Sequence, residues 1–364
     1  MGTKVINMNQ DLIKKIIEYG IQAPSGDNSQ PWKFVITKDN KIFLYNIADK
    51  DNPILNVHEG GSMISHGAVI INIEIAADSF GYKTIVSYFP DASLKDLVAV
   101  LYFIENNKQN NFYNSNLLEA IKRRCTNRNH YKKELKEDIK NELDQISKVT
   151  DLKIKLFYNQ EDKDFLASCI SISEEIILQT KDLHELLFAD VAWTKKEESV
   201  KRHGLYVKTL EFNPVQLFVF WLCRKWNNIS FLNRKIGFAK IVGNQNALIY
   251  KSSGVIGLIL IPNTDKINYV KAGELLQYIW LKSTSLGLGF QPVTGLFFLN
   301  ERIRNFGNDP MTKENSKKVS DTYNNLKKYT KTNESDIVVT SFRIGQSKNS
   351  SGRSSRLKPN IIIE

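Results

Sequence analysis

The sequence contains little cysteine and no long apolar run. Its 364 residues include three cysteines, Cys125, Cys169 and Cys223. They are widely spaced and form no CxxC pair, so neither a disulfide framework nor a zinc site is indicated. The longest apolar stretches, such as 217–223, are far shorter than the ~20 residues of a membrane-spanning helix. The first ten residues are polar and lack the apolar centre of a secretion signal. We therefore expect a cytoplasmic chain without a membrane partner.

The sequence also lacks metal-ligand spacing, a Gly-x-Gly-x-x-Gly turn and any recognisable nucleic-acid-binding module. Its net charge of +11 indicates either a lysine-rich solvated surface or attraction of anionic ligands. We expect no metal and no nucleic acid. Of the five histidines, only His203 is a candidate for a functional role, with a structural role as the alternative. Hydrophobic residues make up 42% of the chain, and at ~150 residues per domain the length suggests two units.

Two segments of the chain align without a gap and suggest an internal duplication. Gly67 and Gly81 have the same spacing as Gly273 and Gly287. The stretch between each pair is largely apolar and about four turns long at ~3.6 residues per turn, which predicts two buried central helices. The closing glycine of each pair suits a left-handed helix end. The alternative is that two buried helices merely share a composition.

The surroundings of the two segments repeat as well. An amphipathic segment precedes each, at 11–21 and 138–146, and a β-branched run follows each, at 97–104 and 337–344. Further strands are predicted at 32–36, 42–45 and 152–158. Because this mixture is not a regular βαβα alternation, we expect an α+β fold with helices packed on mixed sheets.

A helix stop, a polar turn and a strand start are predicted at 23–34, where the sequence reads Ala-Pro-Ser-Gly-Asp-Asn-Ser-Gln-Pro-Trp-Lys-Phe. Pro24 does not continue a helix, Gly26 frees the backbone, and Pro31 belongs at the first position of a strand. Such a turn offers amides and short polar side chains to a ligand, and a plain connection is the alternative. The run resembles the early loop of the nitroreductase family. The resemblance implies that FMN is contacted by Pro24, Ser25, Gly26, Asn28 and Gln30.

A second, basic motif reads Ile-Lys-Arg-Arg-Cys-Thr-Asn-Arg at 121–128. It is similar to the Arg-Arg-Ser-x-Arg element of the same family. Two adjacent arginines can clamp a phosphate bidentately, and a solvated basic helix end is the alternative. The resemblance implies that Arg123, Arg124, Cys125 and Arg128 meet the FMN phosphate. Cys125 stands where the family has serine, and Arg128 comes one residue later than the family's arginine.

Two later segments extend the resemblance. The run 287–295 is similar to the family's loop beside the reactive flavin N5, where a backbone N–H of the loop meets N5. It implies cofactor contacts for Pro292, Val293, Thr294 and Gly295, and a plain helix stop is the alternative. The run 340–345 resembles the family's last sheet strand, after which a basic residue reaches the phosphate. Arg353 and Arg356 are the candidates here, and a solvated, mobile tail is the alternative.

The distribution of the motifs implies one flavin site per chain. The first half has the Pro-Ser-Asn turn but no arginine pair in its first ten residues, whereas the second half has the arginine pair but only a short link at 148–155. We therefore expect a tandem-duplicated, nitroreductase-like fold that resembles the fused Acg-like branch. Residues 1–110 and 111–346 would form the halves of a monomeric pseudo-dimer, with the central helices at the interface between them. Residues 347–364 would form a basic arm, and 185–240 would be either a lid over the flavin or an ordinary helical pair.

The resemblance implies an FMN-dependent oxidoreductase that takes hydride from NAD(P)H through flavin N5 and passes electrons to a small planar acceptor such as a nitroaromatic or a quinone. The flavin carries the chemistry, so no catalytic side chain is required. Two alternatives stay open. One is a protein that stores or shields FMN with little turnover, and the other is a specialised flavin oxidase or dehydrogenase of a biosynthetic cluster.

Overall fold

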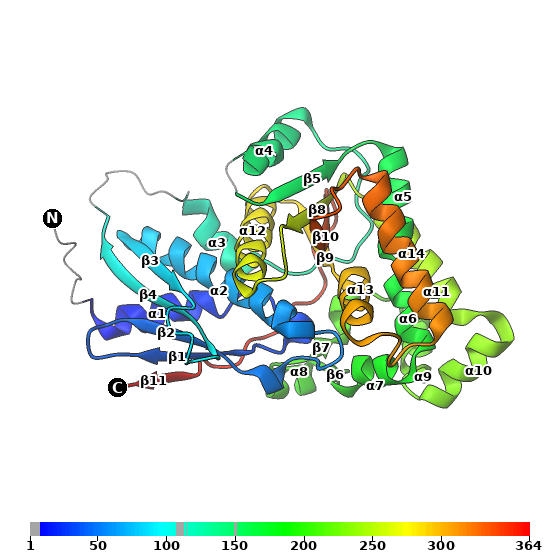
Figure 1. The fold of residues 1–364 in the computed structure, drawn as a ribbon, viewed down its shortest axis with the longest axis horizontal. Coiled ribbons are helices and arrows are strands. Elements are labelled where there is room, and N and C mark those ends of the chain that lie inside the picture. Colours follow the sequence, from blue (N-terminus) through cyan, green and yellow to red (C-terminus); the bar gives the residue numbers. More distant parts are fainter. Residues whose placement is uncertain (1–7, 107–112, 114, 149–150) are drawn as a thin grey trace. The chain divides into compact units, whose positions relative to one another are not determined.

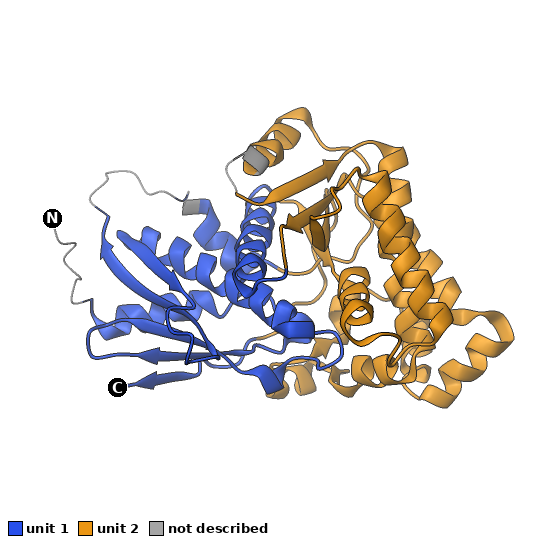
Figure 2. Cartoon of the chain, viewed as in Figure 1, with its two compact units in different colours: residues 1–124, 264–286, 356–364 blue, residues 125–263, 287–355 orange. Residues whose placement is uncertain are grey.

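The structure is a computed structural model that describes residues 8–106, 113, 115–148 and 151–364 (Figure 1). The chain divides into two compact units, each built from segments far apart in the sequence (Figure 2). Unit 1 comprises residues 1–124, 264–286 and 356–364, and unit 2 comprises residues 125–263 and 287–355. The boundary expected between residues 110 and 111 lies outside the described residues. The compact units therefore interleave along the chain, whereas the halves expected from the sequence were consecutive.

Unit 1 contains a five-stranded mixed sheet in the order β11-β1-β2-β4-β3. Its antiparallel members are β1 (Trp32–Ile36), β2 (Ile42–Asn46), β4 (Leu97–Glu105) and β3 (Tyr82–Tyr88). The strands predicted at 32–36, 42–45 and 97–104 are confirmed to within one residue at each end. The sheet is continuous from β1 to β4 because Phe34 pairs with Leu44 and Leu44 pairs with Ala99.

The last strand of unit 1 lies within the predicted basic arm, for which a mobile tail was the alternative. β11 (Ile361–Ile363) pairs in parallel with β1, and the Phe34 N–H donates to Asn360 O at 2.9 Å. Upstream, in unit 2, Ser350 Oγ donates to Glu211 Oε1 at 2.6 Å. Carboxylate and strand partners that lie far away in the sequence therefore order this polar segment, although its composition alone indicates disorder.

The two central helices predicted from the aligned segments are confirmed as α2 (Gly60–Ser79) and α12 (Lys266–Ser285), and they pack on each other within unit 1. Gly67 and Gly273 lie inside the helices and not at their starts. A Cβ at Gly67 would lie 1.9 Å from Val270 O, and one at Gly273 would lie 2.0 Å from Ile64 O. The contact is reciprocal, because each glycine meets the residue three positions before the other. That symmetry is typical of an isologous interface.

Each central helix ends as the sequence predicts. Gly81 has φ +85° and Gly287 has φ +73°, the left-handed conformation that glycine adopts without steric penalty. α1 (Gln10–Gly20) and α3 (Ser115–Arg123) lie against α2. A cluster of buried side chains joins α2, α3 and α12, and its members are Ile71, Ile75, Leu117, Ala120, Ile121 and Leu281.

Unit 2 contains a four-stranded antiparallel sheet in the order β5-β8-β10-β9. The strands are β5 (Lys153–Phe157), β8 (Val255–Ile261), β9 (Gly289–Val293) and β10 (Ile337–Gly345). The strands predicted at 152–158 and 337–344 are confirmed to within one residue. Every residue of β8 is buried, as expected of a central strand covered on both faces.

Helices form the rest of unit 2, together with a two-stranded parallel pair, β6 (Val191–Ala192) and β7 (Leu205–Tyr206). The amphipathic segment predicted at 138–146 is α4 (Glu137–Lys148). The insertion near 185–240 contains more than a helical pair. The other α-helices of unit 2 are α5 (Gln160–Ile170), α6 (Ile172–Gln179), α7 (Lys181–Ala189), α8 (Lys195–Lys201), α9 (Pro214–Leu222), α10 (Trp226–Ile236), α11 (Phe238–Lys251), α13 (Gly295–Phe306) and α14 (Lys313–Tyr329).

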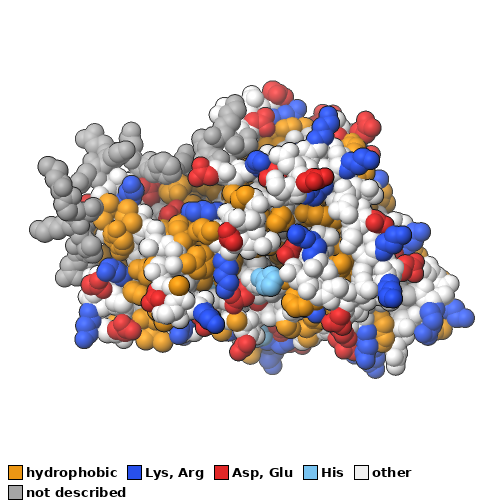
Figure 3. All heavy atoms as spheres, viewed as in Figure 1, with side chains coloured by type: hydrophobic (Ala, Val, Ile, Leu, Met, Phe, Trp, Pro, Cys, Tyr) orange, Lys and Arg blue, Asp and Glu red, His pale blue; other side chains and the backbone are white. Residues whose placement is uncertain are grey.

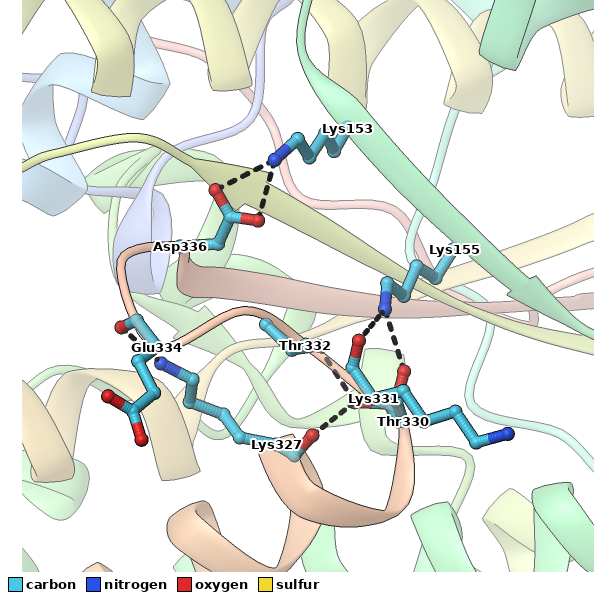
Figure 4. Close-up of polar contacts among 8 residues, drawn as sticks. All are labelled: Lys153, Lys155, Lys327, Thr330, Lys331, Thr332, Glu334 and Asp336. Atoms are coloured by element: carbon cyan, nitrogen blue, oxygen red, sulfur yellow. Dashed lines mark hydrogen bonds and ion pairs between the residues drawn. The ribbon is translucent and has the colours of Figure 1, made fainter.

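Two lysines of β5 fix the connection between α14 and β10 (Figure 4). Lys153 Nζ lies 2.7 Å from Asp336 Oδ2, and Lys155 Nζ donates to Thr330 O at 2.7 Å and to Lys331 O at 2.9 Å. These carbonyls follow the end of α14, where a helix leaves acceptors unpaired and favours positive charge. This part of the lysine-rich surface has a structural role.

Candidate functional site

The predicted ligand turn, residues 23–31 of unit 1, has an unusual backbone. Asp27, Asn28 and Gln30 have φ values of 45°, 59° and 56°. The prediction that Gly26 supplies the backbone freedom of this turn is wrong, because Gly26 is not among the residues with positive φ. Asp and Asn tolerate the left-handed region better than most residues, because their short side chains form local hydrogen bonds. The Gln30 N–H donates to Ser25 Oγ at 2.9 Å, which closes the turn.

Two of the predicted arginines meet this turn at adjacent backbone carbonyls. Arg124, which is buried, donates from Nη2 to Gln22 O at 2.9 Å, and Arg356 donates from Nε to Ala23 O at 3.1 Å. The Leu357 N–H donates to Gln30 Oε1 at 2.8 Å, which ties the C-terminal segment to the same turn. Residues from three distant parts of the sequence therefore converge on 22–30 within unit 1.

The two arginines at the end of α3 differ in burial and in their contacts. The Arg124 guanidinium lies 4.4 Å from the centre of the Trp280 ring, a cation–π distance, while its Nη2 holds the turn. Arg123, one residue earlier, is exposed. Arg124 therefore positions the turn, whereas the Arg123 side chain is accessible to solvent.

Asp51 is a residue of this region that sequence reasoning missed. Its Oδ2 accepts from Ser62 Oγ at 2.7 Å, and a Cβ at Gly26 would lie 3.3 Å from its Oδ1. Burial raises the pKa of this carboxyl. A side chain at Gly26 would therefore pack closely against Asp51, and Gly26 does not serve a positive φ. No local motif marks Asp51, because its contacts depend on the fold.

In unit 2 the basic motif continues through Asn127, which is buried. Its Nδ2 donates to Ser347 Oγ and to Lys348 O, both at 2.8 Å. Arg128, one residue later than in the family's element, donates from Nη1 to Thr209 O at 2.9 Å. Cys125 is a half-buried free thiol. Burial lowers the pKa of Arg353, and interaction with Cys125 opposes that shift, so these two predicted residues are electrostatic neighbours.

A buried polar network holds this segment in place. Arg343 is fully buried, donates from Nη2 to Asn129 O at 2.8 Å and stacks 3.9 Å from the centre of the Tyr131 ring. Tyr250 OH donates to Glu174 Oε1 at 2.5 Å, and burial raises the pKa of Glu174. The sequence predicts Arg343 only as part of a strand. A charged residue inside a run of buried strand residues was the available signal for its role, because a buried charge requires partners.

The predicted N5-side loop is partly a strand. Pro292 and Val293 belong to β9, where Pro292 pairs with Phe342 and Val293 with Ser341. β9 is an edge strand, which accommodates proline because an edge position does not need its N–H. Thr294 and Gly295 follow at the start of α13. The first N–H groups of this helix have no helical acceptor, and its positive dipole end favours negative charge.

Gly295 also allows close packing, since a Cβ there would lie 2.5 Å from Ser173 Cβ.

In the aromatic-rich insertion, His203 Nδ1 lies 2.6 Å from Asp190 Oδ2, and Lys201 Nζ lies 3.2 Å from Asp190 Oδ1. A short aromatic cluster lies nearby in the chain, formed by Phe188, Trp193, Phe212 and Phe220. The structure thus gives His203 a carboxylate that orients its ring.

Within the described part of the chain, no group of three or more His, Cys, Asp or Glu residues is arranged to hold a metal ion. Over the same residues, no helix has both the length and the apolar character needed to cross a bilayer.

Comparison with known proteins gives distant similarities. No family profile matches the sequence. An uncharacterized protein of Mycobacterium tuberculosis (strain CDC 1551 / Oshkosh) is 22% identical over 287 residues, which is 78% of this chain and 38% of that protein. The chain therefore spans well under half the length of this relative.

The solved structures that resemble the chain include nitroreductases. The FMN-dependent nitroreductase from Clostridium difficile R20291 is 11% identical, with 65% of this chain and 90% of that chain covered and a TM-score of 0.34. The FMN and NADPH-dependent nitroreductase NfnB from Sphigopyxis sp. strain HMH is 12% identical, with 66% and 94% covered and a TM-score of 0.35. These alignments assign no residue of this chain to a flavin site, so the site is argued from the chain's own contacts.

Proposed function

We propose that this chain binds FMN and acts as an oxidoreductase that uses NAD(P)H to reduce a small planar acceptor such as a nitroaromatic or a quinone. The observation that carries the proposal is the convergence in unit 1. Arg124 and Arg356 hold the neighbouring carbonyls of Gln22 and Ala23, directly before the Pro-Ser-Gly-Asp-Asn turn. The arginine pair and the C-terminal basic segment thus both reach the turn, although about 100 and 330 residues separate them from it in the sequence.

The donor set at this turn fits a phosphate. Arg123 offers an exposed guanidinium, whose planar fork matches a phosphate bidentately. Arg124 and Arg356 add positive charge beside it, and Ser25 and Asn28 add short polar side chains. Successive residues in left-handed and αR conformations, as at Asn28 and Ser29, can also direct backbone N–H groups toward an anion. We infer that Arg123 pairs with the phosphate while Arg124 and Arg356 position the turn.

FMN, when bound, would supply the hydride transfer itself, and the chain supplies phosphate binding and orientation. The other residues that the resemblance implies lie in unit 2 and stay predictions: Cys125, Arg128, Pro292, Val293, Thr294, Gly295 and Arg353.

The test compares FMN with riboflavin, which lacks the phosphate. Arg123→Ala should weaken FMN binding by roughly 10- to 100-fold, since a hydrogen bond to a charged group contributes about 1.5–3 kcal/mol. It should leave riboflavin affinity unchanged. Lys122→Ala is the matched control, because Lys122 is an exposed cation on the same turn of α3. Fluorescence quenching of each flavin on titration with protein measures both affinities. Equal FMN affinity in wild type and Arg123→Ala would remove Arg123 from the phosphate site.

A second measurement separates the reductase from a storage protein. The protein loaded with FMN should lose its yellow absorbance when NADPH or NADH is added without oxygen, and recover it in air. Bleaching by dithionite but not by either nicotinamide would instead favour FMN storage. A colourless protein that rejects added FMN would refute both functions.

A further inference from the structure

One helix of unit 2 presents an apolar face to solvent. α9 has the sequence Pro-Val-Gln-Leu-Phe-Val-Phe-Trp-Leu, and none of its residues is buried. Val215 is 72% exposed, Phe218 59%, Trp221 42% and Leu222 38%. Residues 215, 218 and 222 follow i, i+3 and i+7 spacing, so they form one continuous stripe. Singly exposed apolar residues are ordinary, but a contiguous patch indicates an interaction surface.

The opposite face of α9 is apolar as well. Val219 packs against a cluster that contains Cys223, Ile229 and Ala239, and Phe220 lies 4.7 Å from Phe188 between ring centres. A helix that is hydrophobic all round normally lies in a protein core or in a membrane. The inner face therefore anchors α9 to unit 2, and the outer face remains unaccounted for by the fold.

The segment of the chain that contains this helix carries charge of one sign. Between Glu211 and Asp265 there is no acidic residue, whereas six basic residues occur there. This segment thus carries more than half of the chain's net charge of +11. Five of the six are exposed and form no ion pair with a carboxylate of the described residues: Arg224, Lys225, Arg234, Lys235 and Lys240.

Aromatic and basic side chains are combined at the end of the helix. The Arg224 guanidinium lies 3.9 Å from the centre of the Trp221 ring, so the cation lies directly beside the apolar stripe. Phe231 and Ile236 of α10 are also more than half exposed. In Figure 3, basic side chains lie at the right-hand edge of the view, where Figure 1 places α10. We define the α9 surface as Val215, Leu217, Phe218, Trp221 and Leu222 with Arg224 and Lys225, which connect α9 to α10, and the basic residues of α10 and α11.

This combination selects one type of partner. A second copy of the chain would bring the same concentration of positive charge against itself, which is unfavourable. A nucleic acid would match the charge, and Phe218 and Trp221 could stack on bases, but it would leave the exposed aliphatic side chains of Val215, Leu217 and Leu222 without an apolar partner. An anionic bilayer matches both features, because its headgroups attract the lysines and arginines while its acyl boundary accepts Trp, Phe and Leu side chains.

We propose that the α9 surface attaches the protein to the face of an anionic lipid bilayer. α9 has nine residues, far fewer than a span requires, so it lies in the interface without crossing it. This attachment departs from the expectation that the chain has no membrane partner. That expectation depended on the absence of long apolar runs, which excludes spanning but not surface binding. The proposal does not depend on flavin binding.

Co-sedimentation of the full chain with lipid vesicles tests the proposal. Vesicles of phosphatidylcholine with a minority of phosphatidylglycerol should bind the protein, vesicles of phosphatidylcholine alone should bind it much more weakly, and high salt should reduce binding. Reversing two charges with Arg224→Glu and Lys225→Glu should lower partitioning by about 100-fold or more. Phe218→Ser with Trp221→Ser should lower it by at least about 10-fold.

Matched controls come from elsewhere in unit 2. Phe306→Ser removes an exposed phenylalanine of α13, and Lys313→Glu with Lys317→Glu reverses two exposed charges on α14. Neither should change vesicle binding by more than about twofold. The proposal is overturned if the wild type does not sediment with anionic vesicles, or if the control variants reduce binding as much as the α9 pairs. It is also overturned if light scattering shows a dimer that Phe218→Ser with Trp221→Ser dissociates.

Discussion

Replacing Glu74 with glutamine should make the protein more stable at neutral and alkaline pH. Glu74 lies on α2, in unit 1, and its Oε2 accepts from Tyr113 OH at 3.2 Å. Burial and the nearby charge of Glu274 raise its pKa to about 7. Lys271, which lies 2.8 Å from Glu274, only partly offsets these effects. At pH 8 the wild type therefore keeps an ionised carboxylate in an unfavourable environment.

The magnitude follows from linkage between protonation and folding. The carboxyl pKa rises from its ordinary value of 4.5 to about 7 in the folded protein. Between these values the folded state holds a proton that the unfolded state has lost, so stability falls as pH rises from 4.5 to 7. One pKa unit corresponds to ~1.36 kcal/mol, which gives on the order of 3 kcal/mol across the window. Glutamine does not ionise and should not show this loss.

Urea denaturation of wild type and Glu74→Gln at several pH values between about 4.5 and 8 measures the effect. The free energies of unfolding should agree near pH 4.5 and diverge to about 3 kcal/mol in favour of the variant at pH 8. Glu119→Gln, at an exposed position of α3, is the control and should track the wild type throughout. Parallel curves for wild type and Glu74→Gln would refute the reasoning.

Two further outcomes are expected. His66 is fully buried, its Nε2 lies 3.0 Å from Asn46 Oδ1, and burial lowers its pKa to about 3. The contribution of neutral His66 to the free energy of unfolding is complete above pH 6.5 and has fallen by about 2 kcal/mol at pH 5. The wild type should therefore lose more stability between pH 7 and 5 than His66→Gln does. Gly67→Ala should destabilise unit 1 by about 3 kcal/mol or more, because its Cβ would meet Val270 O at 1.9 Å. Gly81→Ala, with φ +85° and open space around it, should cost only about 1 kcal/mol. Equal thermal shifts for the two alanine variants would contradict the close helix contact.

Much of the local structure could be predicted from the sequence. β1, β2, β4 and the two central helices follow from apolar periodicity and glycine positions, which are local signals. The partners of these elements could not be predicted in the same way. α12 is the aligned partner of α2, yet nothing in its own sequence places it in unit 1 with residues 1–124.

The candidate site shows the same division between local and distant signals. The turn at 23–31 and the arginine pair are recognisable motifs, and the structure brings Arg124 and Arg356 to the turn. The left-handed conformation of Asp27 and Asn28 was not predicted, because the sequence assigns the backbone freedom of this turn to Gly26. Pro292 was assigned to a loop, since the edge position that accommodates a proline in β9 is set by the order of strands.

β11 has a consequence for how the protein is made. The strand that completes the first sheet is formed by residues 361–363, and it pairs with residues 34–36. During synthesis, the outer edge of β1 therefore stays uncovered until residues 361–363 have left the ribosome. An unpaired strand edge is a template for pairing with other chains. A chain that stops before Ile361 should accordingly assemble with its neighbours during translation, and a chaperone that shields β1 should increase the yield of folded protein.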